Sequence, residues 1–266
     1  DGTFIYRPIS EVCRNLKVPL VWMQRGCWKP DVDAKNTQRH NADKFCDAVV
    51  VPGDYGCDEL VDAGGKVVPK YVGPIVISNS DSLHSAYRAR ELLHLPREKK
   101  LVLIQIGAGV INETEGLQAA AINAVNALGE EWAPVLVSNP LNSQIRSNKA
   151  YCVEAYPLAD YYAAFSFGIF AAGYNTVQES ITFKLPGIFI PNLSTKTDDQ
   201  MRRAKGVVDE GLGLVAIDTK SLEARILELA NTKLRNGIKS RMAEALQEDG
   251  AKDAAKYVED FRIPAN

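Results

Sequence analysis

The sequence predicts an α/β fold of two Rossmann-like lobes, the first of them incomplete. Short runs of β-branched and aliphatic residues alternate with amphipathic stretches, which is typical of parallel strands joined by crossover helices. The runs in the second half hold few polar residues, which indicates strands covered on both faces. The chain has 266 residues, 46% of them apolar, and can therefore bury one large core or two medium ones.

Residues 1–80 are predicted to be the remainder of an amino-terminal lobe. A helix is expected over residues 8–16, because Pro8 suits a first helical turn. Strands are expected at 18–22 and 47–52, where apolar and β-branched residues cluster. The chain begins at Asp1 without a methionine, as if just past the end of a strand, so we expect upstream sequence to be missing.

The boundary between the lobes is expected near residue 80. Residues 72–77 combine turn residues with a short apolar run, and Ser80-Asp81-Ser82 then offers N-caps for a charged helix that ends near Leu95. Residues 81–250 are predicted to form the second lobe. Residues 251–266 are predicted to form a terminal helix that packs back toward the first lobe.

The second lobe opens with the most apolar strand of the chain, at residues 100–106. Gly107-Ala108-Gly109 and a helix at about 115–128 follow it, and a strand, a glycine turn and a helix begin a Rossmann-like unit. The pattern predicts further strands at 135–138, 165–171, 187–191 and 213–217, and helices at 157–164, 175–184, 198–209 and within 221–261.

Charge and cysteine content exclude several classes of function. The 31 basic and 33 acidic residues leave a net charge of -2, so nucleic acid is not an expected partner. Five cysteines form an odd set without a C-x-x-C pair, and we expect a reducing, cytoplasmic setting in which each is a buried hydrophobe or a bystander. No metal site is proposed. No apolar run approaches the roughly 20 residues of a membrane-spanning helix.

Gly107-Ala108-Gly109 is a weak indication of a phosphate site. Glycines between a strand and a helix are needed for the turn whether or not a phosphate lies there. The segment also departs from the dinucleotide-binding pattern, because Asn112 stands where a glycine is expected. On this segment alone, a structural role is favoured.

The turn after the strand at 165–171 is more informative. Gly173 would allow a ligand to approach the backbone, and the N–H groups near Tyr174, Asn175 and Thr176 would receive an anionic diphosphate. Glu179 lies on the same helical face, and its two oxygens suit the vicinal hydroxyls of a ribose. Alternatively, Asn175 or Thr176 merely caps the helix and Glu179 is a solvated first-turn acid. The segment alone favours neither interpretation over the other.

A second polar turn follows the next strand. Asp199 can accept hydrogen bonds from sugar hydroxyls, and Gln200 can both donate and accept. Ligands bind outside the carboxyl ends of parallel strands, so both turns are expected to face one crevice. The alternative, in which Asp198 and Asp199 cap a helix, is favoured for either residue taken singly.

Together the two turns resemble the donor-binding half of GT-B glycosyltransferases, and in particular the peptidoglycan N-acetylglucosaminyltransferases and related UDP-glycosyltransferases. The residues that fall on the family pattern are Gly173, Thr176, Glu179, Pro186, Pro191 and Gln200. The resemblance implies that Glu179 holds the ribose and that residues 173–176 hold the diphosphate, with Gly107, Ala108 and Gly109 approaching from the other side. It also implies that Asp199 and Gln200 contact the sugar and that Ala155 and Tyr156 contact the base.

The same resemblance implies a reaction. An acceptor hydroxyl of a glycan, a lipid-linked sugar or a small molecule would displace the nucleoside diphosphate of a UDP-sugar, or of another nucleotide sugar, at the anomeric carbon. No metal and no other cofactor are expected. The catalytic base is expected in the missing part of the amino-terminal, acceptor-side lobe. A location in the cytoplasm, with attachment at the inner face of the membrane, is a further expectation.

Two other hypotheses stay open. Nucleotide-sugar 2-epimerases share the two-lobe architecture, although their acids and histidines are not recognisable in this sequence. The chain could also be a non-catalytic nucleotide-sugar-binding module, either an inactive homologue or one subunit of a split transferase whose partner supplies the rest of the first lobe. The start at Asp1 motivates this third hypothesis.

Overall fold

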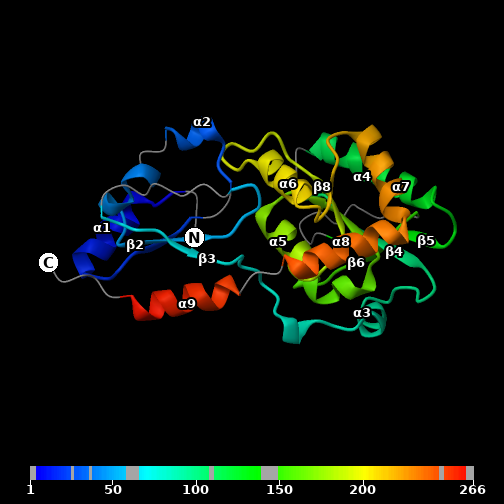
Figure 1. Cartoon of the computed structure of the whole chain (residues 1–266), viewed down its shortest axis with the longest axis horizontal. Coiled ribbons are helices and arrows are strands. Elements are labelled where there is room, and N and C mark those ends of the chain that lie inside the picture. Colours follow the sequence, from blue (N-terminus) through cyan, green and yellow to red (C-terminus); the bar gives the residue numbers. More distant parts are fainter. Residues whose placement is uncertain are drawn as a thin grey trace. The chain divides into compact units, whose positions relative to one another are not determined.

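The structure is a computed structural model that describes residues 4–24, 27–35, 38–57, 66–107, 111–138, 149–245 and 249–261. The chain divides into two compact units (Figure 1). Unit 1 comprises residues 1–75, 193–203 and 247–266, and unit 2 comprises residues 76–192 and 204–246. Both contain parallel sheets, and the predicted α/β class is confirmed.

The sheet of unit 1 has three parallel strands in the order β1-β2-β3. They are β1 (Val21–Met23), β2 (Ala48–Pro52) and β3 (Lys70–Val72). β3 was not predicted, because two of its three residues are exposed and leave no apolar run to detect. The helices described in this unit are α1 (Arg7–Leu16), α2 (Pro30–Asp33), the 3₁₀ helix η1 (Arg39–Lys44) and α9 (Gly250–Asp260).

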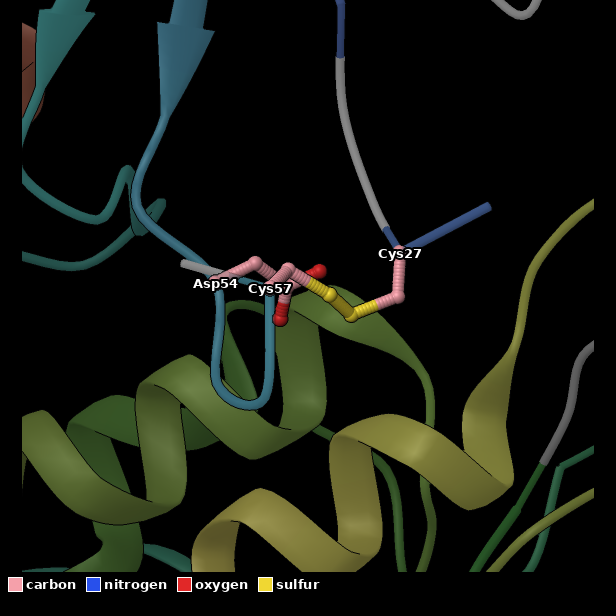
Figure 2. Close-up of side chains that lie close together, drawn as sticks. All are labelled: Cys27, Asp54 and Cys57. Carbon is pink, nitrogen blue, oxygen red and sulfur yellow. A yellow bond between two sulfur atoms is a disulfide. The ribbon is translucent and has the colours of Figure 1, made fainter. Parts of the chain in front are cut away.

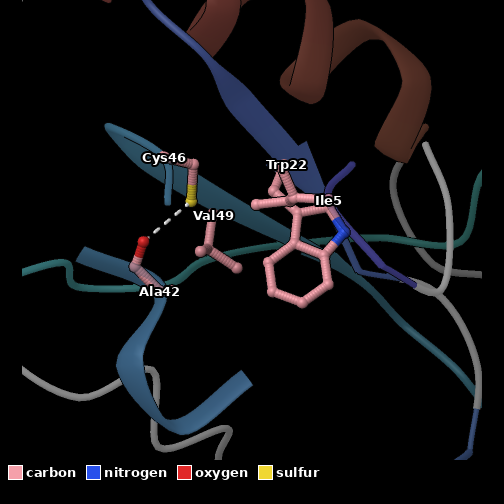
Figure 3. Close-up of a cluster of buried hydrophobic side chains, with 5 residues drawn as sticks. All are labelled: Ile5, Trp22, Ala42, Cys46 and Val49. Carbon is pink, nitrogen blue, oxygen red and sulfur yellow. Dashed lines mark hydrogen bonds between the residues drawn. The ribbon is translucent and has the colours of Figure 1, made fainter. Parts of the chain in front are cut away.

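β2 places successive side chains on opposite faces of this sheet, and each face has its own core. Val49 belongs to a cluster that fills one face (Figure 3), together with Ile5, Trp22, Ala42 and Cys46. Val50 points to the other face, where it packs with Val72 and with Ala254 of α9. The carboxy-terminal helix thus contributes to the core of the first unit.

The sheet of unit 2 has six parallel strands in the order β6-β5-β4-β7-β8-β9. They are β4 (Lys100–Gln105), β5 (Trp132–Val137), β6 (Tyr151–Val153), β7 (Phe167–Ala171), β8 (Gly187–Ile190) and β9 (Leu214–Val215). β4, the first of these six strands in the chain, lies in the middle of this sheet. β5 and β6 follow on one side of β4, and β7, β8 and β9 follow on its other side. β6, a short strand with two exposed residues, was not predicted.

Helices connect these strands and cover the sheet (Figure 1). They are η2 (Ser80–Ser82), α3 (Ala86–Leu92), α4 (Ile111–Asn126), η3 (Leu158–Ala164), α5 (Tyr174–Thr182), α7 (Thr219–Ala230) and α8 (Thr232–Glu244). Because parallel crossovers are right-handed and the sheet grows in opposite directions from β4, α4 and α5 lie on opposite faces. Accordingly α4 packs with α7, and α5 packs with α8.

One helix start differs from the prediction. Ser80–Ser82 does not cap the charged helix but forms the separate 3₁₀ helix η2, whose own cap is the Asn79 side chain. Ser85 caps α3 instead, accepting from the Arg88 N–H at 3.3 Å. Both positions offered a capping hydroxyl, and the local sequence did not distinguish between them.

The division into units differs from the predicted lobes chiefly at residues 193–203; in addition, the boundaries expected after residues 80 and 250 fall after residues 75 and 246. Residues 193–203 lie with unit 1, although the sequence pattern assigned them to the second lobe. α6 (Gln200–Asp209) therefore begins in unit 1, and its remaining residues belong to unit 2. None of the helices within the described ranges is long and apolar enough to span a bilayer.

Candidate functional site

The sheet of unit 2 reverses its direction of growth between β4 and β7. In open parallel sheets, ligands bind outside the carboxyl ends of the strands at such a switch point. Gln105, the last residue of β4, pairs with Phe170 of β7, so the turns that follow the two strands start side by side. These are the turns that begin at Gly107 and at Gly173. The topology thus brings together two segments predicted to approach a diphosphate.

Gly107 has a backbone reason to be glycine. Its φ is +79°, which side-chain-bearing residues rarely adopt, and a Cβ there would lie 3.3 Å from the Cβ of Ala171. The structural interpretation of this position therefore holds. Ala108 and Gly109 lie outside the described residues, so contact between this turn and a diphosphate stays a prediction.

Gly173 has no such structural reason. Its φ is -71°, and a Cβ built on it would meet no heavy atom of the described residues within 4 Å. Gly173 is the N-cap of α5, which leaves the helix without a side-chain cap. The alternative in which Asn175 or Thr176 caps the helix is therefore wrong. An uncapped helix start beside open space is a favourable place for an anion.

Glu179 lies in the second turn of α5 and is half-buried, so it is not a solvated first-turn acid. Burial raises the pKa of its carboxyl to about 7, and the negative charge of Asp160 adds to that shift. A hydrogen bond from the Ile77 backbone opposes it. Glu179 can therefore change its protonation near neutral pH, and a ligand that donates hydrogen bonds to it would favour the ionised form.

Three polar side chains near the same switch point have buried atoms without a hydrogen-bond partner among the described residues. They are Ser78 Oγ, directly after Ile77; Gln105 Oε1, at the end of β4; and Tyr162 OH. Burial, followed by the charge of Glu179, raises the pKa of Tyr162. Because buried polar groups in proteins are nearly always hydrogen-bonded, these atoms are suited to meet a ligand or bound water.

Sequence reasoning missed these three residues. Gln105 gave a signal, since it is a lone amide directly after four apolar strand residues, Leu101 to Ile104. Ser78 and Tyr162 gave none, because neither belongs to a motif and their proximity to the switch point depends on the folded chain.

Ala155 and Tyr156 follow β6 at the same edge of the sheet. Tyr156 is 83% exposed, and its peptide bond to Pro157 is cis. β5 separates β6 from β4 in the sheet. The proposed contact of this turn with a nucleotide base stays a prediction.

Asp199 and Gln200 lie in unit 1, and thus in a different unit from Glu179. Asp199 Oδ1 accepts a hydrogen bond from the Arg202 N–H at 3.0 Å, which shows that Asp199 caps α6. Asp198 does not share that role, because both of its carboxylate oxygens accept from Arg203. Contact of Asp199 and Gln200 with a sugar remains a prediction.

Arg203 is fully buried between two carboxylates of unit 1. Its Nε and Nη2 donate to Asp54 at 2.8 Å each, and its Nη1 and Nη2 donate to Asp198 at 3.0 and 2.6 Å. Burial lowers the pKa of the guanidinium, but the hydrogen bonds and charges of the two acids outweigh it and raise that pKa. The guanidinium is therefore ionised and is held as a planar fork.

Beside this group, Cys27 and Cys57 form a disulfide (Figure 2). Their Cα atoms are 5.6 Å apart, although 30 residues separate them in the sequence. The expectation of a reducing setting, in which each cysteine is a buried hydrophobe or a bystander, is therefore wrong for this pair, because folding brings the segments after β1 and β2 together. Ligand atoms of Cys27, Asp54 and Cys57 lie within 4.8 Å of one another. The two sulfurs are bonded to each other, however, and Asp54 accepts from Arg203.

The chain matches a family of known proteins. The family described as "Glycosyltransferase family 28 C-terminal domain" matches residues 97–258, which is more than half of the 266 residues. The match covers the whole sheet of unit 2, from β4 to β9, and most of α9. It confirms the resemblance predicted from the turns that contain Gly173 and Gln200.

Individual relatives agree with this match. A UDP-N-acetylglucosamine–N-acetylmuramyl-(pentapeptide) pyrophosphoryl-undecaprenol N-acetylglucosamine transferase of Thermosipho africanus is 25% identical over 251 residues, which cover 91% of this chain and 66% of the relative. The chain thus spans just under two thirds of that protein.

Solved structures show the same fold. The spinosyn rhamnosyltransferase SpnG, complexed with thymidine diphosphate, aligns with a TM-score of 0.64 and 14% identity, covering 94% of this chain and 69% of that one. MurG of Acinetobacter baumannii aligns with a TM-score of 0.62 and 15% identity, covering 98% and 72%.

Proposed function

The chain belongs to the glycosyltransferase family 28 carboxy-terminal domain family, and from this premise we propose that it holds the nucleotide-sugar donor of a glycosyl transfer. The observation that carries the proposal is the switch point of unit 2. There the uncapped start of α5 at Gly173 and the half-buried Glu179 stand where parallel sheets bind ligands.

In this proposal each part of the donor has a protein partner. The Glu179 carboxylate accepts both ribose hydroxyls, and the first turn of α5, from Gly173 to Thr176, receives the diphosphate. Asp199 and Gln200 contact the sugar, and the turn at Ala155 and Tyr156 contacts the base. The named donor of the Thermosipho africanus relative and the nucleotide bound to SpnG support a nucleoside-diphosphate sugar; we take UDP-N-acetylglucosamine as the first candidate.

The proposed chemistry is a single displacement. An acceptor hydroxyl oxygen forms a bond to the anomeric carbon while the bond from that carbon to the diphosphate oxygen breaks. The positive end of the α5 dipole stabilises the departing diphosphate, and a general base takes the hydroxyl proton. The reaction is proposed to need no metal, because the helix start supplies the stabilising charge.

The acceptor and the location are proposed from the relatives alone. A glycan or lipid-linked acceptor agrees with the relative's name, and a place at the cytoplasmic face of a membrane suits such an acceptor. The Cys27–Cys57 disulfide removes cysteine usage as an argument for the cytoplasm, since disulfides are rare in reducing compartments.

Titration calorimetry with UDP-N-acetylglucosamine tests the proposal. The wild-type protein is expected to bind, and Glu179→Ala is expected to weaken binding about 10- to 100-fold, because two hydrogen bonds to a charged group are lost. The same affinity is expected with a metal chelator present. Absence of binding to a panel of nucleotide sugars, or unchanged binding by Glu179→Ala, would overturn the donor-site assignment.

A further inference from the structure

Residues 193–200, which we name the sugar loop, leave β8 and reach the first residue of α6. This loop carries Asp199 and Gln200. Its backbone is fixed to the segment that follows β1: Trp28 and Asp198 form a β-bridge, and the Asp199 N–H donates to the Cys27 carbonyl at 2.6 Å. These contacts lie within unit 1 and determine where the loop runs.

Lys29 adds three more contacts along the same loop. Its backbone N–H donates to the Thr197 carbonyl at 2.9 Å. Its ammonium donates to the carbonyls of Leu193 and Thr195 at 3.2 and 2.6 Å. The sugar loop is thus held along most of its length by Cys27, Trp28 and Lys29.

Arg203 fixes the other end of the sugar loop. Asp54 alone would neutralise a buried guanidinium, yet Arg203 also binds Asp198, whose side chain is 31% exposed and could be solvated without it. The second carboxylate is therefore not needed to neutralise Arg203. Its effect is geometric, because the bidentate pair fixes residue 198 relative to residue 203, with Asp199 and Gln200 between them.

The disulfide connects the two segments that hold the sugar loop, the one at Cys27 and the one at Asp54. Cys27, which accepts the Asp199 N–H, is bonded to Cys57, three residues after Asp54. Arg202 adds a link to the same turn by donating to the Gly56 carbonyl at 2.5 Å. A sugar contact must be held to within about half an ångström to favour one productive geometry, and this arrangement supplies that restraint.

We propose that Arg203 is a positioning residue for the donor sugar: through Asp198 and Asp54 it holds the sugar loop so that Asp199 and Gln200 present their polar atoms to the sugar. The proposal rests on the proposed function, because it takes the sugar as the ligand of these two residues. It adds a role for Arg203, Asp54 and the Cys27–Cys57 disulfide.

The test compares the affinities of UDP and UDP-N-acetylglucosamine for the same variants. Arg203→Lys keeps the charge but cannot bind two carboxylates through a planar fork. It is expected to weaken UDP-N-acetylglucosamine binding about tenfold and to change UDP binding less than twofold, because it does not alter the proposed nucleotide contacts, Glu179 and residues 173–176. The matched control is Arg235→Lys, which alters a buried arginine that donates to the Leu229 and Ala230 carbonyls of unit 2. It should leave the ratio of the two affinities unchanged.

A second variant covers the case in which Arg203→Lys does not fold. Asp198→Asn removes only the carboxylate of the partly exposed Asp198 and is expected to produce the same selective loss. Equal losses for UDP and UDP-N-acetylglucosamine, or no loss in either variant, would overturn the positioning role and leave the proposed function standing. Failure of the wild-type protein to bind either compound would overturn both.

Discussion

In the proposed donor site, the protonation of Glu179 makes nucleotide binding depend on pH. Burial raises the pKa of its carboxyl to about 7 in the free protein, and two ribose hydroxyls donate best to the ionised form. Affinity for UDP-N-acetylglucosamine is therefore expected to fall as the pH decreases from 8 to 6, approaching tenfold per unit below the pKa. Calorimetry at pH 6, 7 and 8 measures this slope. Glu179→Gln should bind weakly and without the slope; an equal slope in that variant would assign it to another group.

The same shift affects the stability of the free protein. The folded state binds more protons than the unfolded state between the ordinary pKa of 4.5 and about 7, so stability decreases as the pH rises through that window. Replacing the carboxylate by an amide should therefore stabilise the free protein at pH 8, by about 1–2 kcal/mol after allowance for solvent screening of a half-buried group. At pH 4 the difference should vanish. Thermal melts of the two proteins provide this comparison.

Some residue roles could be predicted from the sequence, and others could not. The spacing from Gly173 to Glu179 predicted that these residues share the start of one helix, since helical neighbours are local in sequence. The Cys27–Cys57 bond joins two residues that are 30 positions apart. Arg203 and Asp54, which form an ion pair, are 149 positions apart. Contacts of that kind depend on tertiary folding and leave no periodic signal.

The start of α5 is the element on which the diphosphate proposal depends. Gly173→Ala should fold normally, because the backbone there suits alanine and its methyl group meets no described atom; loss of a glycine N-cap costs no more than about 1 kcal/mol. The methyl group would occupy the space proposed for the diphosphate, so UDP affinity should fall at least about tenfold.

A glycine of the same unit provides the control for this prediction. A Cβ on Gly116 of α4 also meets nothing within 4 Å, and Gly116→Ala should stabilise the helix by up to about 1 kcal/mol without changing UDP affinity. Unaltered UDP affinity in Gly173→Ala would mean that the diphosphate does not approach the start of α5.

Strand length and burial decided which elements could be predicted. β4 and β7 are five or six residues long and almost wholly buried, so their apolar runs identified them. β3 and β6 have three residues each, two of them exposed, and their pairing depends on neighbouring strands. The order of the strands, which defines the switch point, is likewise a property of the whole sheet.

At the scale of the whole molecule, the predicted lobes and the observed units differ in the sugar loop. The loop follows a strand of unit 2, and for that reason the sequence pattern assigned it to the second lobe. Its contacts with Cys27, Trp28 and Lys29 assign it to unit 1 instead. Because the chain spans 66% of its Thermosipho africanus relative, the acceptor side of the reaction stays a proposal.

Hydrogen exchange with and without saturating UDP tests most directly whether the switch point of unit 2 is the nucleotide site. The amides of residues 173–180, at the start of α5, are expected to become protected, together with those at Gly107 and at Ile77 and Ser78. The sheet core should exchange equally slowly in both states. Protection confined to other segments under conditions where UDP binds would contradict the assignment of the donor site to this point of the fold.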